Sequence, residues 1–319
     1  MIEIKNLKIS ANGYDVFKNL SLEIDDGNSC AVFLGKGCGK TMLSAAIAGA
    51  IDADDGEICI DGAYMDTENS SLKGSVGFYS ADVDMPGFLS VYEALSFFGS
   101  ARGASDEALS RQIDEALSLV DLTELSSCSV ASLSPYYRAK LGIATTLMGK
   151  PSLLIYDDIF KGLSESDTEQ LIELVKLIAS KKQTVLICSS PLAASKCCSH
   201  ALFIDNDRVV LSGSIEGIER EINKTVKMKL EIKGDRAEIE NRLSGMPEIA
   251  GVCSVGDDER SLFEIEYYDD SEIKDKLFAA MAEIGAPILS YEGKRLTLVD
   301  VYRSLINDAS GEAEKKDEK

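Results

Sequence analysis

The chain has 319 residues, of which 45 % are hydrophobic, and a formal net charge of −21. This length supports more than one hydrophobic core, so we expect two domains. No apolar run approaches the roughly 18 residues of a membrane span, and the charged, alternating start MIEIKNLKIS is unlike a signal peptide. We therefore expect a cytoplasmic protein with reduced thiols, and the acidity argues against nucleic acid as a ligand.

The first two thirds of the chain alternate strand-like and helix-like segments. Apolar or alternating runs predict strands at residues 2–9, 20–24, 30–34, 57–60, 75–79, 152–158, 184–190 and 201–205. Helical patterns occupy residues 40–51, 105–120, 136–149 and 166–181, the last with a capping box from Ser166 to Glu169. Strands that alternate with helices predict a largely parallel α/β sheet.

Residues 33–42, FLGKGCGKTM, join an apolar strand to a helix through a glycine-rich turn. Such a turn presents N–H groups and a helix N-terminus to phosphate, with Lys40 on the β- and γ-phosphates and Thr41 on Mg²⁺. The usual spacing places the first glycine of this motif at Leu34. Either Leu34 replaces that glycine, or the loop is one residue short and begins at Gly35. The alternative is a glycine-rich turn that binds nothing.

The predicted strand SLLIYDD ends in two carboxylates, Asp157 and Asp158. In a protein with a phosphate loop, the first would hold Mg²⁺ and the second would polarise the attacking water. Alone, a strand that ends in two aspartates is weak evidence, because acidic residues often end strands. Together with the Gly-Lys-Thr sequence upstream, the two aspartates are stronger evidence for a nucleotide site.

This order of motifs resembles the nucleotide-binding subunit of ATP-binding cassette (ABC) transporters, over about residues 1–215. DADDGEICIDG resembles the turn and strand after the first helix of that family, and GFLSVYEALSFFGSARG resembles the start of its helical subdomain, at about residues 88–150. ASLSPYYRAKLGIATTLMGKPSLLIYDD resembles its signature helix and second acidic strand. The resemblance implies a P-loop NTPase fold of the ABC ATPase type.

The resemblance also implies the ligands ATP and Mg²⁺ and a set of site residues. Tyr14 matches an aromatic residue that stacks on adenine, although a surface tyrosine is equally compatible with the sequence. Asp158 and Lys40 take the catalytic positions, and Thr41 and Asp157 take the metal-binding positions. The nucleotide-binding positions fall on Gly35, Lys36, Gly37, Cys38, Gly39, Lys40, Thr41 and Met42.

The segment that would complete the site of a partner subunit departs from the family pattern. In the family, two subunits close head to tail, and each ATP meets the sequence Leu-Ser-Gly-Gly-Gln of the other chain. Here that sequence is LSPYY. Ser134 matches the serine of the family. Pro135 lacks an N–H, and Tyr136 replaces a glycine that permits close approach of the backbone to the nucleotide. We therefore expect this half of the site to be poor.

Further departures affect groups that act on water and the γ-phosphate. Asp158 is one methylene shorter than the glutamate of the family, and loss of a general base costs roughly 10²- to 10⁴-fold in rate. The switch histidine falls on Ser190, and His200 is better explained as a structural residue. The metal-sensing glutamine falls near Ala81, and Ser164 replaces a loop aspartate. We expect nucleotide binding to be retained and hydrolysis to be weakened.

Near residue 222 the pattern changes. Residues 223–308 predict strand, helix, strand, strand, helix, strand and a last helix, which suits a small α+β domain of the split βαβ kind. Its end, RLTLVDVYRSL, resembles the C-terminal extension of ATP-binding subunits of ABC-2 type exporters; an unrelated α+β appendage is the alternative. We expect the acidic tail, residues 309–319, to be disordered.

The resemblance implies an ATP-binding subunit that couples to a separate membrane permease, suspected to be of the ABC-2 type. It would act as a homodimer, or as a heterodimer with another such subunit, at the inner face of the cell membrane. The alternative is a non-hydrolysing module of the same fold that regulates a transporter complex. A soluble ABC protein of translation or DNA repair fits less well, because only one cassette is present and the chain is acidic.

Overall fold

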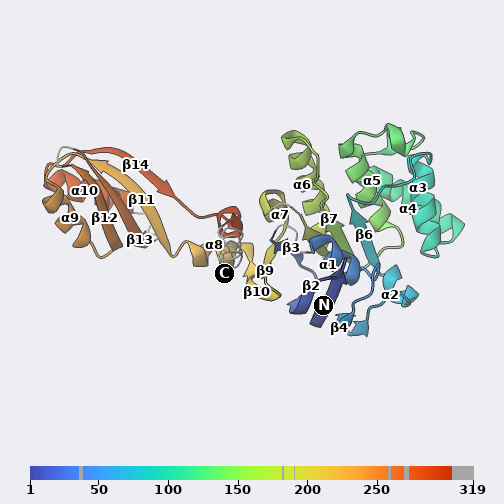
Figure 1. Cartoon of the computed structure of the whole chain (residues 1–319). Coiled ribbons are helices and arrows are strands. Elements are labelled where there is room, and N and C mark those ends of the chain that lie inside the picture. Colours follow the sequence, from blue (N-terminus) through green and yellow to red (C-terminus); the bar gives the residue numbers. More distant parts are fainter. Residues whose placement is uncertain (36–38, 182, 190, 258–259, 269–272, 304–319) are drawn as a thin grey trace. The chain divides into compact units, whose positions relative to one another are not determined.

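The computed structural model describes the chain except for residues 36–38, 182, 190, 258–259, 269–272 and 304–319. It divides into two units (Figure 1). Among the described residues, the first comprises Met1–Ile215 together with Tyr302 and Arg303, and the second comprises Glu216–Val301. The sequence interpretation places this boundary at about residue 222, and the tail it predicts at 309–319 lies outside the described residues.

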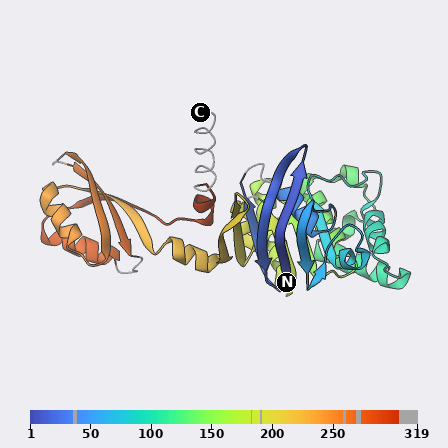
Figure 2. The same cartoon turned by 60° about the horizontal axis from the view of Figure 1, so that its bottom comes forward.

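A four-stranded antiparallel sheet forms one layer of the first unit. Its order is β2-β1-β4-β5, with β1 at Ile2–Ala11, β2 at Tyr14–Ile24, β4 at Asp55–Ile60 and β5 at Ala63–Tyr64. Figure 2 shows β1 and β2 side by side, in blue. Ile2 pairs with Ile24 and Ile4 pairs with Leu22, so alternate apolar side chains of both strands enter the core.

A six-stranded sheet forms the centre of the first unit. Its order is β10-β9-β3-β8-β7-β6, with β10 at Arg208–Ser214, β9 at His200–Asp205, β3 at Ser29–Leu34, β8 at Thr184–Cys188, β7 at Leu153–Asp157 and β6 at Val76–Ser80. All neighbours are parallel except β10, which is antiparallel to β9. The predicted parallel α/β sheet is confirmed, and the carboxyl ends of its central strands meet at one edge.

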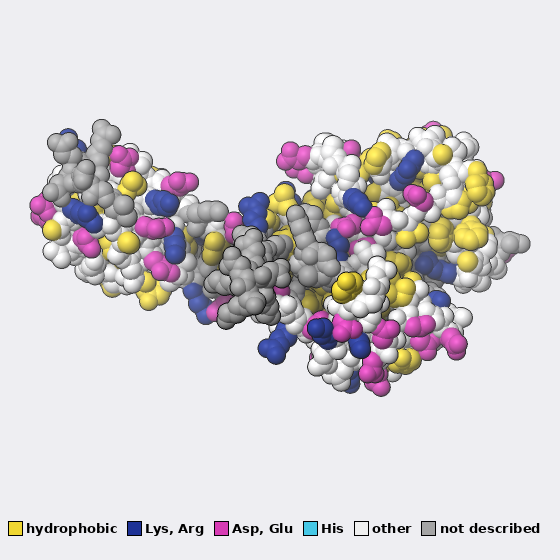
Figure 3. Space-filling model, viewed as in Figure 1, with side chains coloured by type: hydrophobic (Ala, Val, Ile, Leu, Met, Phe, Trp, Pro, Cys, Tyr) yellow, Lys and Arg dark blue, Asp and Glu magenta, His cyan; other side chains and the backbone are white. Residues whose placement is uncertain are grey.

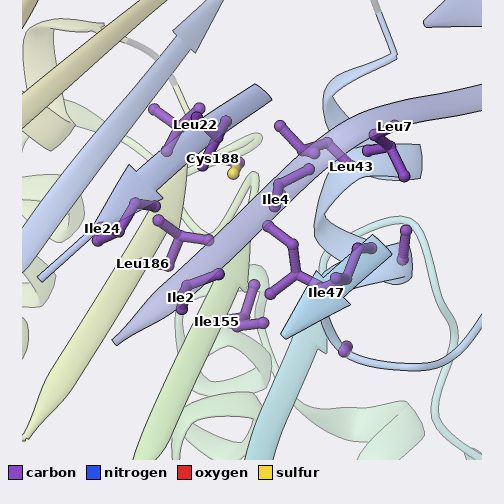
Figure 4. Close-up of a cluster of buried hydrophobic side chains, with 14 of the residues drawn as sticks. Ile2, Ile4, Leu7, Leu22, Ile24, Leu43, Ile47, Ile155, Leu186 and Cys188 are labelled. Atoms are coloured by element: carbon purple, nitrogen blue, oxygen red, sulfur yellow. The ribbon is translucent and has the colours of Figure 1, made fainter. Parts of the chain in front are cut away.

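Helices cover this sheet, and one of them starts the site. The elements are α1 at Lys40–Ile47, α2 at Ser70–Gly74, α6 at Glu165–Ala179 and α7 at Pro191–Cys197. Leu43 and Ile47 of α1 join Ile155 and Leu186 of the sheet and Ile4 of β1 in one buried apolar cluster (Figure 4). The cluster fixes α1 between the two sheets, because apolar burial stabilises by roughly 25 cal/mol per Å².

Three further helices form the region predicted as a helical subdomain. They are α3 at Val91–Ala101, α4 at Asp106–Leu119 and α5 at Pro135–Leu147, with 3₁₀ turns at Thr123–Leu125 and Val130–Ser132. Arg102, just after α3, donates hydrogen bonds to the carbonyls of Thr145, Thr146, Met148 and Val76. It therefore ties the end of α5 to β6, and its own burial lowers its pKa.

The predicted N-cap of α6 is wrong by two residues. Ser164 caps the helix and accepts a hydrogen bond from the N–H of Asp167 at 3.1 Å. The capping box expected from Ser166 to Glu169 is absent, because Ser166 already lies inside the helix. Two serines at this spacing are equally good caps by sequence.

The second unit has the expected order of elements. A helix, α8 at Ile215–Ile222, leads into β11 at Thr225–Ile232, α9 at Arg236–Ser244, β12 at Ile249–Asp257, β13 at Arg260–Tyr268, α10 at Ile273–Glu283 and β14 at Ile288–Lys294. The sheet order is β12-β13-β11-β14, antiparallel throughout. The predicted split βαβ arrangement is confirmed, and α9 and α10 share one apolar core with the sheet.

Candidate functional site

The site begins where β3 gives way to α1. Gly39 precedes α1 with a φ of 78°, in the left-handed region that favours glycine. A Cβ at this position would lie 2.1 Å from Val16 Cγ1 and 2.9 Å from Phe17 Cε2. Only glycine therefore allows β2 to approach the start of α1 so closely.

The predicted loop is only partly described. Lys36, Gly37 and Cys38 lie outside the described residues. Leu34 is the last residue of β3, and its buried side chain belongs to the core cluster. Gly35 follows β3 directly and α1 begins at Lys40, so the strand and the helix that flank the predicted loop occur in the predicted order.

Lys40 and Asp158 form an ion pair at the carboxyl edge of the sheet. Lys40 Nζ lies 2.5 Å from Asp158 Oδ1, and both side chains are about a quarter exposed. The backbone of Asp158 is also held, because its N–H donates to the Cys188 carbonyl and its carbonyl accepts from the Lys161 N–H, each at 2.8 Å. The two predicted catalytic residues are thus brought together and paired with each other.

Asp157, the last residue of β7, is fully buried. Its Oδ2 accepts a hydrogen bond from Ser80 Oγ at 2.9 Å, and its Oδ1 has no hydrogen-bond partner in the described part of the chain. Burial raises the pKa of Asp157, while the hydroxyls of Thr41 and Ser80 and the charge of Lys40 oppose this shift and the charge of Asp158 adds to it.

This environment suits a cation. A buried carboxylate oxygen without a donor is costly, and a metal ion would compensate it. Magnesium is commonly held by one or two protein oxygens together with phosphates and water, so the donor pair Asp157 and Thr41 fits it. Among the described residues, no group of three or more His, Cys, Asp or Glu side chains is arranged to hold a metal by itself.

Tyr14 and Met42 are the outer members of the predicted nucleotide-binding set. Tyr14 is the first residue of β2 and is 78 % exposed, so its ring is available to a ligand. Val16 lies two positions further along β2, and its Cγ1 would be the atom nearest to a Cβ at Gly39. Met42 is half-buried against the core cluster.

The segment LSPYY forms the start of α5. Ser134 is the N-cap and accepts a long hydrogen bond of 3.5 Å from the N–H of Tyr137. Pro135 occupies the first helical position, where a missing N–H costs the helix nothing. Tyr136 donates to Gln170 Oε1 at 3.2 Å, and Lys140 Nζ lies 4.8 Å from the centre of the Tyr136 ring. The substitutions are thus part of a well-ordered helix start.

The structure also places Ala81 and His200, two other residues considered in the sequence. Ala81 follows β6 and donates its N–H to the Asp157 carbonyl at 3.0 Å. Ser190 lies outside the described residues. His200 lies in β9, where its Nδ1 is 3.0 Å from Ser199 Oγ and its backbone pairs with Cys30 of β3.

Two features of this edge were missed by sequence reasoning. Ser80 orients the buried carboxylate of Asp157, and the parallel register places these two residues opposite each other. An ion pair between Lys161 and Asp82 lies beside them and raises the pKa of Lys161. The strand-end position of Ser80 was the available signal, because carboxyl ends of neighbouring parallel strands meet.

A cavity with apolar and charged side chains in its lining lies between β6 and the start of α5. The cavity has a volume of about 420 Å³ and is lined by Tyr79, Ala81, Val83, Asp84, Met85, Gly87, Val130, Ala131, Pro135, Arg138, Ala139, Ile159 and Lys161. Nearby in sequence, Val83 and Phe88 are 65 % and 85 % exposed, and Phe97 of α3 is 61 % exposed. Hydrophobic side chains gather over this helical region (Figure 3).

Comparison with known sequences places the site in context. Residues 17–161 match the protein family described as ABC transporter. The chain is 24 % identical over 215 residues to the Linearmycin resistance ATP-binding protein LnrL of Bacillus subtilis, covering 67 % of this chain and 69 % of that protein. It is 27 % identical over 227 residues to the Methionine import ATP-binding protein MetN of Carboxydothermus hydrogenoformans, covering 68 % and 67 %.

Solved structures share the fold. The dimeric structure of a post-hydrolysis state of the ATP-binding cassette MJ0796 bound to ADP and Pi aligns with a TM-score of 0.60 at 18 % identity, covering 67 % of this chain and 98 % of that chain. A structure of an ATP-binding subunit of an ABC transporter aligns with a TM-score of 0.61 at 22 % identity, covering 70 % and 93 %. Among the described helices of the present chain, none is both long and apolar enough to cross a membrane.

Proposed function

We propose that the chain is the ATP-binding subunit of an ABC transporter and couples ATP binding to a separate membrane permease; the match of residues 17–161 to the ABC transporter family and the fold shared with solved ATP-binding cassettes support this. The observation that carries this proposal is the meeting of Lys40, Asp157 and Asp158 at one edge of the sheet. A lysine at a helix start beside a buried, incompletely satisfied carboxylate suits a nucleotide with its magnesium ion.

Each side chain has a role in this proposal. Lys40 binds the β- and γ-phosphates, and the first turn of α1 offers N–H groups to them. Asp157 and Thr41 hold Mg²⁺, which would neutralise phosphate charge when bound. Tyr14 packs on the adenine. The burial of Leu34 in β3 favours Gly35 as the first residue of a shortened phosphate loop.

We propose that hydrolysis is weak. Asp158 is engaged by Lys40, and its short side chain limits its reach toward an attacking water. In the signature segment, the Ser134 oxygen already caps α5, and the ring of Tyr136 stands where the family has glycine. Ser190 offers no imidazole. These features support nucleotide binding as the working step, with hydrolysis slow.

The partners proposed are a second ATP-binding subunit, identical or different, and an integral-membrane permease of the ABC-2 type. Three exposed apolar side chains support a permease contact, since such surface is otherwise costly in water: Val83, which lines the 420 Å³ cavity, and Phe88 and Phe97, which follow it in the sequence. The chain would then lie on the inner face of the cell membrane through its partner. A non-hydrolysing regulatory module would use the same contacts, and turnover separates the two.

The test of this proposal is calorimetric titration of the full chain with ATP and Mg²⁺. We expect saturable binding that Lys40→Ala abolishes and that Asp157→Asn makes insensitive to Mg²⁺. Lys18→Ala is the matched control, because Lys18 is exposed on β2, and it should bind as the wild type does. Absence of binding by the wild-type chain would overturn the proposal.

A further inference from the structure

The chain leaves the first unit after Ile215 and rejoins it at Tyr302. The Tyr302 hydroxyl donates a hydrogen bond to the main-chain carbonyl of Leu34 at 3.0 Å. Its ring lies 6.0 Å from that of Phe33, at an interplanar angle of 59°. Phe33 is buried and packs in turn on Phe203 of β9, with ring centres 4.8 Å apart.

The Leu34 carbonyl lies directly before the predicted phosphate loop. Leu34 ends β3, and Gly35 starts the glycine-rich turn immediately after it. Pairing between β3 and β8 extends only to Ala31, whereas pairing with β9 continues to Leu34 opposite Ile204. The last residues of β3 are therefore held by one neighbouring strand, and Tyr302 adds a second attachment.

We propose that Tyr302 is a positioning residue for nucleotide binding. Its hydroxyl holds the end of β3, which sets where the phosphate loop begins. The residue touches no phosphate itself and acts through the Leu34 carbonyl. This inference rests on the proposed nucleotide binding.

The aromatic and polar contributions of Tyr302 are separable. Tyr302→Phe keeps the ring against Phe33 and removes only the hydrogen bond to Leu34. Tyr268→Phe is the matched control, because Tyr268 is an exposed tyrosine at the end of β13 in the second unit. Both changes preserve size and apolar packing, so both variants should fold.

The experiment compares ATP affinity and amide hydrogen exchange in the full-length wild type and the two variants. We expect Tyr302→Phe to weaken ATP binding by about three- to tenfold, the range that loss of one hydrogen bond produces. Without nucleotide, exchange should rise at Leu34, Gly35 and the first turn of α1 and stay unchanged in the second unit. Tyr268→Phe should match the wild type in both measurements.

The outcomes that overturn this inference are distinct. Equal ATP affinity and equal exchange in the wild type and Tyr302→Phe would reject the role of Tyr302 and leave nucleotide binding intact. Faster exchange throughout the first unit, with a matching fall in thermal stability, would assign Tyr302 a purely structural role. No ATP binding by the wild type would reject both this inference and the proposed function.

Discussion

Lys40 Nζ lies 2.5 Å from Asp158 Oδ1, so the lysine proposed to bind phosphate is held by the carboxylate proposed to activate water. Nucleotide must therefore break this ion pair before Lys40 reaches a phosphate. Both groups are partly exposed, and pairs of this kind contribute about 0.2–1 kcal/mol. Nucleotide binding can offset the free energy needed to break this ion pair, and the effect on ATP affinity is large enough to measure.

The first prediction concerns this pair. Asp158→Asn removes the carboxylate charge and releases Lys40, so ATP affinity should rise by about two- to fivefold while any turnover is lost. Titration calorimetry and phosphate release measure the two effects. Glu173→Gln is the control, because it breaks an exposed pair with Lys176 on α6 and should change neither. Weaker ATP binding by Asp158→Asn would contradict the competition.

The second prediction concerns pH. Burial raises the pKa of Asp157, so the folded state disfavours its charged form and loses stability as pH rises from its ordinary value of 3.8 through the raised pKa. Asp157→Asn should therefore melt at a higher temperature than the wild type at pH 7 without nucleotide. The difference should shrink as the pH is lowered toward 4.

Asp52 provides a control of opposite sign. It accepts hydrogen bonds from the N–H and hydroxyl of Thr67, which lower its pKa. This stabilisation is present above the ordinary pKa and is lost as pH falls through the lowered one, so Asp52→Asn should lower the melting temperature at pH 7. Equal pH dependence for the two variants would contradict both assignments.

The third prediction compares two glycines with the same backbone angle. Gly39 and Gly62 each have a φ of 78°, but a Cβ would clash with Val16 only at Gly39 and would meet nothing within 4 Å at Gly62. Gly62→Ala should cost about 1–2 kcal/mol of unfolding free energy from left-handed strain. Gly39→Ala should cost about 1–3 kcal/mol more from overpacking and should abolish ATP binding. Denaturant unfolding measures the loss of unfolding free energy in each variant. Equal losses for Gly39→Ala and Gly62→Ala would contradict this prediction.

The fourth prediction concerns Arg102. Its guanidinium donates to four carbonyls, among them those of Met148 and Val76. Lysine cannot reproduce this fork, so Arg102→Lys should lower the free energy of unfolding by about 2–3 kcal/mol. Arg111→Lys should cost less than about 0.5 kcal/mol, because Arg111 forms an exposed pair with Glu115. A similar fall in the free energy of unfolding for the two variants would show that the hydrogen bonds of Arg102 do not stabilise the fold more than an exposed ion pair does.

Much of the fold could be predicted from hydrophobic period. Buried strands such as β3 and β7 are short continuous apolar runs, and the order of elements in the second unit is confirmed. The edge strand β10 was missed because its sequence, RVVLSGS, does not alternate apolar with polar residues and ends in Ser-Gly-Ser. The sequence pattern could not choose between Ser164 and Ser166 as the cap of α6, because the choice depends on where the chain leaves β7.

The sequence indicates that Lys40 and Asp157 meet at one edge of the sheet, but it does not indicate which side chains contact each other there. Parallel strands and a phosphate-loop motif bring Lys40 and Asp157 to one edge, as the motif order indicates. The pairing of Lys40 with Asp158 depends on side-chain geometry that no spacing rule contains. Ser80 and Tyr302 contact Asp157 and Leu34 across 77 and 268 positions, and only the folded chain reveals such contacts.

The central claim is that the chain binds ATP well and hydrolyses it slowly. The most direct measurement records bound ATP and released phosphate in one preparation of the full chain, beside Lys40→Ala. We expect ATP binding near one per chain, with release at least about a hundredfold below the roughly 10 per second of a typical enzyme. Steady release near 10 per second that disappears in Lys40→Ala would contradict the claim.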